Sequence, residues 1–65
     1  MHTILTRRET NILYNIAAEM NNEEISQKLN LSIFTIKMHT ERICQKLNAK
    51  NKEEAVAEAV KNKLI

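Results

Sequence analysis

Apolar residues recur along this chain of 65 residues at a spacing of three and four, which is the period of helices that bury one side. The clearest stretch runs from Leu31 to Leu47. Within it, a narrow stripe runs at i, i+4, i+7 and i+11 through Ile36, Thr40, Ile43 and Leu47. Charged and polar residues occupy the other side. Read over the whole chain, the same spacing predicts helices at about residues 7–20, 22–29, 33–47 and 52–61.

Capping residues mark where these predicted helices begin. Thr6 and Glu9 stand three apart, as in a capping box, where each side chain accepts a hydrogen bond from the other residue's backbone N–H. Similar signals follow at Asn21–Glu24, Ser32 and Asn51–Glu54. The short turn 30–32 joins the second helix to the third in a helix-turn-helix arrangement, and Asn30 tolerates the left-handed backbone of a sharp helix exit. We therefore predict an all-α fold, a four-helix bundle containing a helix-turn-helix, with residues 1–65 as one domain.

The core is expected to be aliphatic, because the chain has one Phe, one Tyr and no Trp. The helix over 52–61 carries more apolar surface than a peripheral helix should leave in water. Ala55, Ala59 and Val60 either pack inward or form a contact with a second copy of the chain, and the pattern alone favours neither. The predicted core comprises Leu5, Ile12, Leu13, Ile16, Ala17, Ile25, Leu29, Leu31, Ile36, Ile43, Leu47 and Val56.

Charge is concentrated around the 33–47 helix. The net charge is only +2, but residues 31–50 hold Lys37, Arg42, Lys46 and Lys50 against Glu41, four positive charges less one negative, or +3. A basic segment of this kind is typical of nucleic-acid binding, and a solvated helix face is the alternative explanation.

Several function classes find no support in the residues. One cysteine allows no internal disulfide, and no apolar run approaches the roughly 18 residues that span a bilayer, so a cytoplasmic protein without membrane contact is expected. Cys44 lies beside the core stripe as a small hydrophobe, and no CxxC or HxxxH spacing indicates a metal site. No nucleophile with a base and no glycine-rich loop is present. We expect no enzymatic activity, metal or cofactor.

From about Leu5 to Ile65 the chain resembles the LuxR-type helix-turn-helix domain. The resemblance rests on Leu5-Thr6-x-Arg8-Glu9, Glu24-Ile25, Leu29, Leu31-Ser32, Thr35-Ile36-Lys37-x-His39, Ile43, Lys46-Leu47 and Glu54-Ala55-Val56, all in one gapless register. It implies a four-helix DNA-binding domain, usually the C-terminal module of a bacterial transcription regulator. In that family the third helix enters the major groove and the fourth commonly forms the dimer contact. The implied partners are double-stranded DNA, a second copy, and an upstream regulatory domain or RNA polymerase.

Three positions depart from the family pattern. Glu19 and Lys63 stand where the family usually has glycine, and Lys52 stands where it usually has arginine. Because glycine adopts positive φ at no steric cost, the first helix is the one whose end is open to question. None of the departures falls on the 33–47 helix.

Candidates for base contact lie on the side of the 33–47 helix opposite the apolar stripe. By resemblance Lys37 occupies a DNA-contact position, and an amine can donate to guanine O6 or N7. Met38 offers an apolar contact for a thymine methyl. Glu41 either accepts from cytosine N4 or orients Lys37 through an i,i+4 ion pair.

Candidates for phosphate contact flank this side or lie on the rim of the domain. His39 falls on the histidine position of the family but suits a hydrogen-bonded place at the edge of the core as well. Glu9 is assigned a structural role at the first helix cap. The phosphate candidates are Thr35, His39, Arg42, Lys46, Asn22, Arg8 and Lys50.

These residues favour a sequence-specific DNA-binding module that can dimerise through its last helix. The alternative is a helix-turn-helix fold that docks a protein partner and does not bind DNA, which the low net charge and Glu41 allow.

Overall fold

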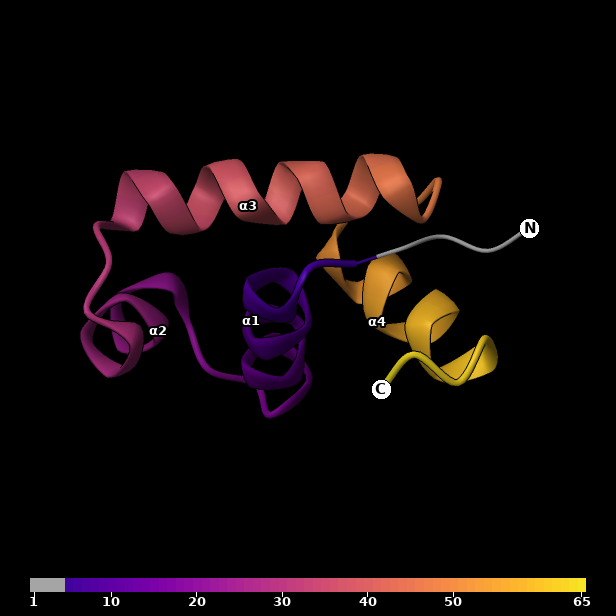
Figure 1. Ribbon diagram of the computed structural model, residues 1–65, viewed down its shortest axis with the longest axis horizontal. Helices are drawn as coiled ribbons and strands as arrows, with labels where there is room; N and C mark the ends of the chain where they lie inside the picture. Colours follow the sequence, from indigo (N-terminus) through magenta and orange to yellow (C-terminus); the bar gives the residue numbers. More distant parts are fainter. Residues whose placement is uncertain (1–4) are drawn as a thin grey trace.

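The computed structural model describes residues 5–65, and within that range it contains four helices and no strand. The helices are α1 (Arg7–Ala17), α2 (Asn22–Leu29), α3 (Ile33–Lys46) and α4 (Lys52–Lys61). Figure 1 shows α3 lying along one side of the molecule, with α2, α1 and α4 below it. All three of these helices contact α3. The predicted all-α fold with a helix-turn-helix over α2 and α3 is confirmed.

The helices begin at the predicted capping residues. In α1 the Glu9 N–H donates to Thr6 Oγ1 at 3.0 Å, and the Thr6 N–H donates to Glu9 Oε1 at 2.8 Å. Asn21 and Glu24 close the same box at α2. At α4 the Glu54 N–H donates to the Asn51 side chain, but the Glu54 carboxylate accepts from the Lys50 N–H at 2.8 Å instead. The Asn51–Glu54 pair therefore caps α4 and also holds the backbone of Lys50, the residue before the cap.

Each helix is followed, within two residues, by a residue with positive φ that is not glycine. These residues are Glu19 (φ 65°), Asn30 (58°), Asn48 (55°) and Lys63 (59°). Because Glu19 turns the chain in this way, α1 ends at Ala17, and the predicted extension to residue 20 is wrong. The Glu19 N–H donates to Ile16 O at 2.9 Å and the Met20 N–H to Asn15 O at 3.2 Å, the pattern of a Schellman motif.

The core lies where α1, α2 and α4 meet the lower side of α3. Ala17 was predicted to lie in it but is exposed, because the chain turns away directly after this residue. Leu5, Leu29, Leu31 and Val56 are partly buried against the core. The buried apolar residues are Ile12, Leu13, Ile16, Ile25, Ile36, Ile43, Leu47, Ala55 and Ala59. Among the described helices, none is long and apolar enough to cross a bilayer.

Candidate nucleic-acid interface

The two sides of α3 differ sharply. Ile36 and Ile43 on the lower side are completely buried, and the Thr40 hydroxyl donates to Ile36 O at 2.8 Å. Figure 1 shows none of the other three helices on the upper side. Lys37 and Glu41 are exposed there. The core thus holds α3 from one side and leaves the other open along its length.

The open side carries a row of side chains that we call the exposed ridge of α3, namely Phe34, Met38, Glu41 and Gln45. They follow at i, i+4, i+7 and i+11, so they lie above one another on a single line of the helix. Phe34 is 71% exposed and Met38 is 41% exposed. Lys37 lies beside this row. The predicted base contacts, Lys37, Met38 and Glu41, therefore share one surface.

Glu41 and Lys37 do not form an ion pair. The salt bridge found within residues 5–65 joins Lys46 to Glu9 instead. Of the two roles weighed for Glu41, orienting Lys37 through an i,i+4 pair is thus not seen. Its carboxylate is exposed on the ridge, where it can accept hydrogen bonds from an external donor.

An open hollow of about 570 Å³ adjoins the ridge. Its lining brings Lys37 and Glu41 of α3 together with Asn22 at the start of α2 and with Lys50 and Lys52 around the start of α4. Residues from three parts of the chain thus place three amines around one concavity next to the ridge. Lys52 was not among the predicted contacts. The sequence could have indicated this residue, because Lys52 stands where the family usually has arginine.

The remaining phosphate candidates lie elsewhere on the domain. Thr35 is half-buried and belongs to the α3 cap, since its N–H donates to Ser32 Oγ at 3.0 Å and the two hydroxyl oxygens lie 2.9 Å apart. Arg42 is exposed beside the ridge, and Arg8 is exposed in the first turn of α1. His39 is half-buried, and its buried Nδ1 has no hydrogen-bond partner among residues 5–65. These four residues do not line the hollow.

Lys46 joins the C-terminal end of α3 to α1. Its Nζ donates to Glu9 Oε1 at 2.7 Å, the same oxygen that accepts from the Thr6 N–H, and the Glu9 side chain is only 3% exposed. Burial by itself raises the pKa of Glu9. The hydrogen bonds from Lys46 and Thr6 and the positive charge of Lys46 outweigh it and lower the pKa below its ordinary 4.5. The structural role assigned to Glu9 is confirmed and extends from a helix cap to a connection between helices.

The predicted dimer residues on α4 separate into two groups. Ala55 is 1% exposed and Ala59 is completely buried, because both face the core of their own chain. Their placement on an exposed dimer surface is therefore wrong. Val60 is 57% exposed and is the one residue of the three available to a second copy.

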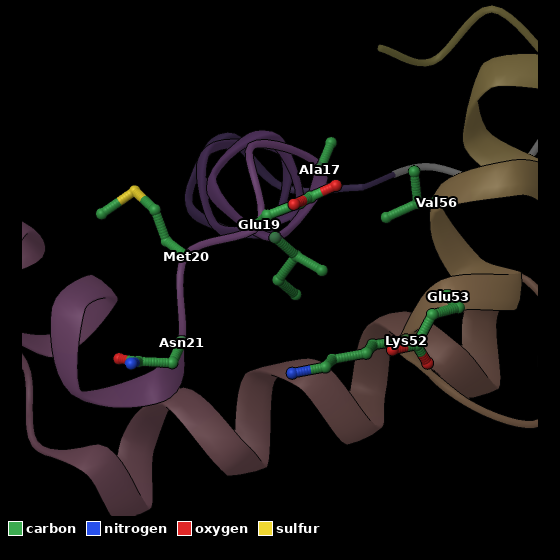
Figure 2. A pocket seen from close by; sticks show the side chains of 8 residues that line it. Ala17, Glu19, Met20, Asn21, Lys52, Glu53 and Val56 are labelled. Atoms are coloured by element: carbon green, nitrogen blue, oxygen red, sulfur yellow. The ribbon is translucent and has the colours of Figure 1, made fainter.

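A second hollow, of about 470 Å³, lies between the exit of α1 and the start of α4. Figure 2 shows Glu19 and Asn21 at one side of it, Val56 on α4, and the Lys52 side chain extended toward Asn21. Its lining contains none of the predicted base or phosphate contacts.

Cys44 lines the first hollow as a half-buried residue. Burial raises the pKa of its thiol, and the negative charges of Glu41, Glu53 and Glu54 add to the effect. A raised pKa keeps the sulfur protonated, which is the less nucleophilic form. Within residues 5–65, no group of three His, Cys, Asp or Glu side chains is placed to hold a metal ion.

A short capped helix, a tight turn and a longer helix with one buried and one open, partly basic side together define a helix-turn-helix domain of the DNA-binding class. Comparison with known proteins agrees. The family model described as "Bacterial regulatory proteins, luxR family" matches residues 3–59. This chain belongs to that family, as the resemblance predicted, and its fold is that of the family's helix-turn-helix DNA-binding domain.

Individual relatives and a solved structure support this assignment. The chain is 47% identical over 62 residues to the oxygen regulatory protein NreC of Staphylococcus carnosus (strain TM300), covering 95% of this chain and 29% of that protein. It is 40% identical over 60 residues to the uncharacterized transcriptional regulatory protein YxjL of Bacillus subtilis (strain 168), covering 92% and 28%. The crystal structure of the response regulator ChrA of a heme-sensing two-component system superposes with a TM-score of 0.93 at 32% identity, covering all of this chain and 32% of that one. The chain thus spans less than a third of the length of these proteins.

Proposed function

We propose that this domain binds double-stranded DNA by inserting α3 into the major groove, with the exposed ridge against the base edges. The observation that carries the proposal is the open side of α3, which lies opposite the core along the whole helix. An α-helix with its side chains is about 10–12 Å across, and the major groove is about 12 Å wide. Helix and groove therefore match in size without any rearrangement of the bundle.

In this arrangement three side chains contact bases. Lys37 donates to guanine O6 or N7, and Met38 packs against a thymine methyl group. Glu41 accepts from the cytosine N4 amino group. The absence of an ion pair between Lys37 and Glu41 supports separate roles for the two side chains.

Phosphate contacts surround the base contacts. The hollow beside the ridge suits one DNA strand, since Asn22, Lys50 and Lys52 meet there and can donate to phosphate oxygens. Thr35, His39 and Arg42 flank the ridge. Lys46 lies at the C-terminal end of α3, where it approaches a phosphate while it also binds Glu9. Arg8 is exposed and precedes Glu9 in the chain, and it contacts a further phosphate.

The experiment that tests this proposal is a titration of a labelled mixed-sequence duplex with the domain, followed by fluorescence anisotropy at several salt concentrations. Each phosphate neutralised in B-DNA contributes about −0.9 to the slope of log K against log salt. We expect a slope that corresponds to several phosphates. A folded chain, checked by circular dichroism, that binds no duplex at low salt would overturn the proposal and favour a protein-docking role.

We further propose that two copies associate through α4. Val60, the exposed member of the predicted dimer residues, carries this proposal. The change Val60→Glu should shift the sedimenting mass toward the monomer in analytical ultracentrifugation. Tyr14→Glu alters an equally exposed apolar residue on α1 and serves as the control. A wild-type chain that sediments as a monomer at high concentration would contradict this proposal.

The setting of the domain is also a proposal. Its relatives are more than three times as long, and one similar structure is a response regulator, which supports an output module attached to an upstream regulatory domain. Residues 1–65 then form one domain that acts in the cytoplasm, where a bacterial chromosome is found. RNA polymerase is a candidate partner there.

A further inference from the structure

Phe34 is the only phenylalanine of the chain, and the fold leaves it outside the core. It is 71% exposed at the first turn of α3, more than any other large hydrophobic residue among those described. Met38, one turn later on the same line, is 41% exposed. Two large apolar side chains left in water contribute no stabilisation from burial, which a chain of this size needs. The pair is therefore expected to be covered when the domain is in use.

The charges around the pair indicate what covers it. Lys37 is adjacent to Met38, and Arg42 lies one turn beyond, so two cations border the apolar pair, together with the one carboxylate of Glu41 on the ridge. An apolar protein surface or a lipid tail gains nothing from this border, whereas a polyanion does. A partner that combines negative charge with small apolar groups fits both features.

We propose that Phe34 and Met38 form one apolar reader for thymine methyl groups in the major groove. The 5-methyl of thymine is the apolar group that base pairs display in this groove. The inference rests on the proposed insertion of α3 and adds to it a base preference and a residue, Phe34, that the sequence pattern did not single out as a contact.

The helix geometry also sets the spacing of the bases that are read. Four residues of α-helix advance about 6 Å along the axis. Bases on one strand advance about 3.4 Å per step. With α3 along the groove, Phe34 and Met38 face methyl groups about two base pairs apart.

The test replaces single thymines by deoxyuridine, which removes the methyl group and keeps every hydrogen-bonding atom. A preferred site is first selected from randomised duplexes with the wild-type domain. Each thymine of that site is then replaced in turn, and Kd is measured for the wild type and for Phe34→Ala, Met38→Ala and the control Tyr14→Ala. Because Phe34 and Tyr14 are both exposed, neither change should unfold the domain.

We expect replacement at two thymines, about two base pairs apart, to weaken wild-type binding about fourfold each, the effect of one buried methyl group. In Phe34→Ala one of these two effects should disappear, and in Met38→Ala the other should. Tyr14→Ala should keep both.

Three results would overturn the inference. Wild-type binding that is insensitive to deoxyuridine at every position would exclude methyl reading while leaving insertion of α3 in place. An equal loss for Phe34→Ala on thymine and uracil sites would assign Phe34 to a contact with the DNA backbone and not to a methyl group. Absence of any duplex binding would remove the proposed function itself.

Discussion

The two ends of α3 are held in different ways. At the N-terminal end, Ser32 caps the helix, while Phe34 and Met38 stand in solvent. At the C-terminal end, Lys46 is paired with the buried Glu9 of α1. One end of the helix is thus tied to the scaffold and the other presents a surface. Stability and DNA affinity should therefore respond to substitutions at opposite ends of the same helix.

The largest effect is expected from Glu9→Ala, which removes the Glu9–Lys46 pair at the C-terminal end of α3. The change removes a buried charge-assisted hydrogen bond and a helix cap, and leaves Lys46 without this carboxylate, so the free energy of unfolding should fall by about 2–3 kcal/mol. Urea unfolding followed by circular dichroism measures it. Glu24→Ala removes the corresponding carboxylate from the exposed box of α2 and should cost about 0.5 kcal/mol. Equal losses in the two variants would show that the connection to α3 adds nothing.

The second prediction concerns the open end. Lys37→Ala should weaken DNA binding by about 1–3 kcal/mol, which is roughly 5- to 150-fold, and relax the preference at one base position. Its free energy of unfolding should change by less than about 0.5 kcal/mol, because the side chain is exposed. Lys61→Ala makes the same charge change at the end of α4 and is the control. A loss of affinity as large for Lys61→Ala would mean that net charge, and not position, determines binding.

The third prediction uses pH to weaken the tied end without changing the scaffold. The pKa of Glu9 is lowered in the folded state, since the hydrogen bonds from Lys46 and Thr6 and the charge of Lys46 outweigh the effect of burial. The stabilisation by the ionised carboxylate is then complete above the ordinary pKa of 4.5 and is lost as the pH falls through the lowered value. The advantage in stability of the wild type over Glu9→Gln should therefore shrink as the pH falls below 4.5. A difference that stays constant down to acid unfolding would contradict this assignment.

The smallest effects are expected at the helix exits. The residue with positive φ is Asn30 after α2 and Asn48 after α3, the two helices of the helix-turn-helix. After α1 and α4 it is Glu19 and Lys63. Asparagine tolerates positive φ better than glutamate or lysine. Glu19→Gly should therefore raise the free energy of unfolding by about 0.5–1 kcal/mol, and Asn48→Gly by less. Thermal unfolding measures both, and an equal gain at the two positions would contradict the distinction.

Much of the fold could be predicted because its signals are local. Caps such as Thr6 and Ser32 act within four residues, and the apolar stripe of α3 has the helical period over its whole length. The end of α1 was harder to place, because nothing in the spacing of apolar residues reveals that a glutamate at position 19 adopts positive φ. Only the departure from the family glycine marked this position.

The candidate site was predictable in part for the same reason. Lys37, Met38 and Glu41 share one side of a helix, so their periodicity alone brings them together. The pairing of Lys46 with Glu9 joins residues 37 positions apart and depends on how α1 packs against α3. Helical spacing likewise leaves undecided which side of α4 faces inward, and the burial of Ala55 could be read only from the folded chain.

The exposed ridge of α3 also limits how much information one copy of the domain can read from a chromosome. In the proposed complex four side chains contact bases, namely Phe34, Lys37, Met38 and Glu41, and they distinguish about four base pairs, or roughly one sequence in 250. On the order of 10⁶ alternative positions compete in a genome, so about 4,000 of them would suit a single α3 equally well. A binding site that occurs only once in the genome therefore requires several copies of the domain bound side by side. The spacing and orientation of these copies then determine the target as much as the bases under any one helix do.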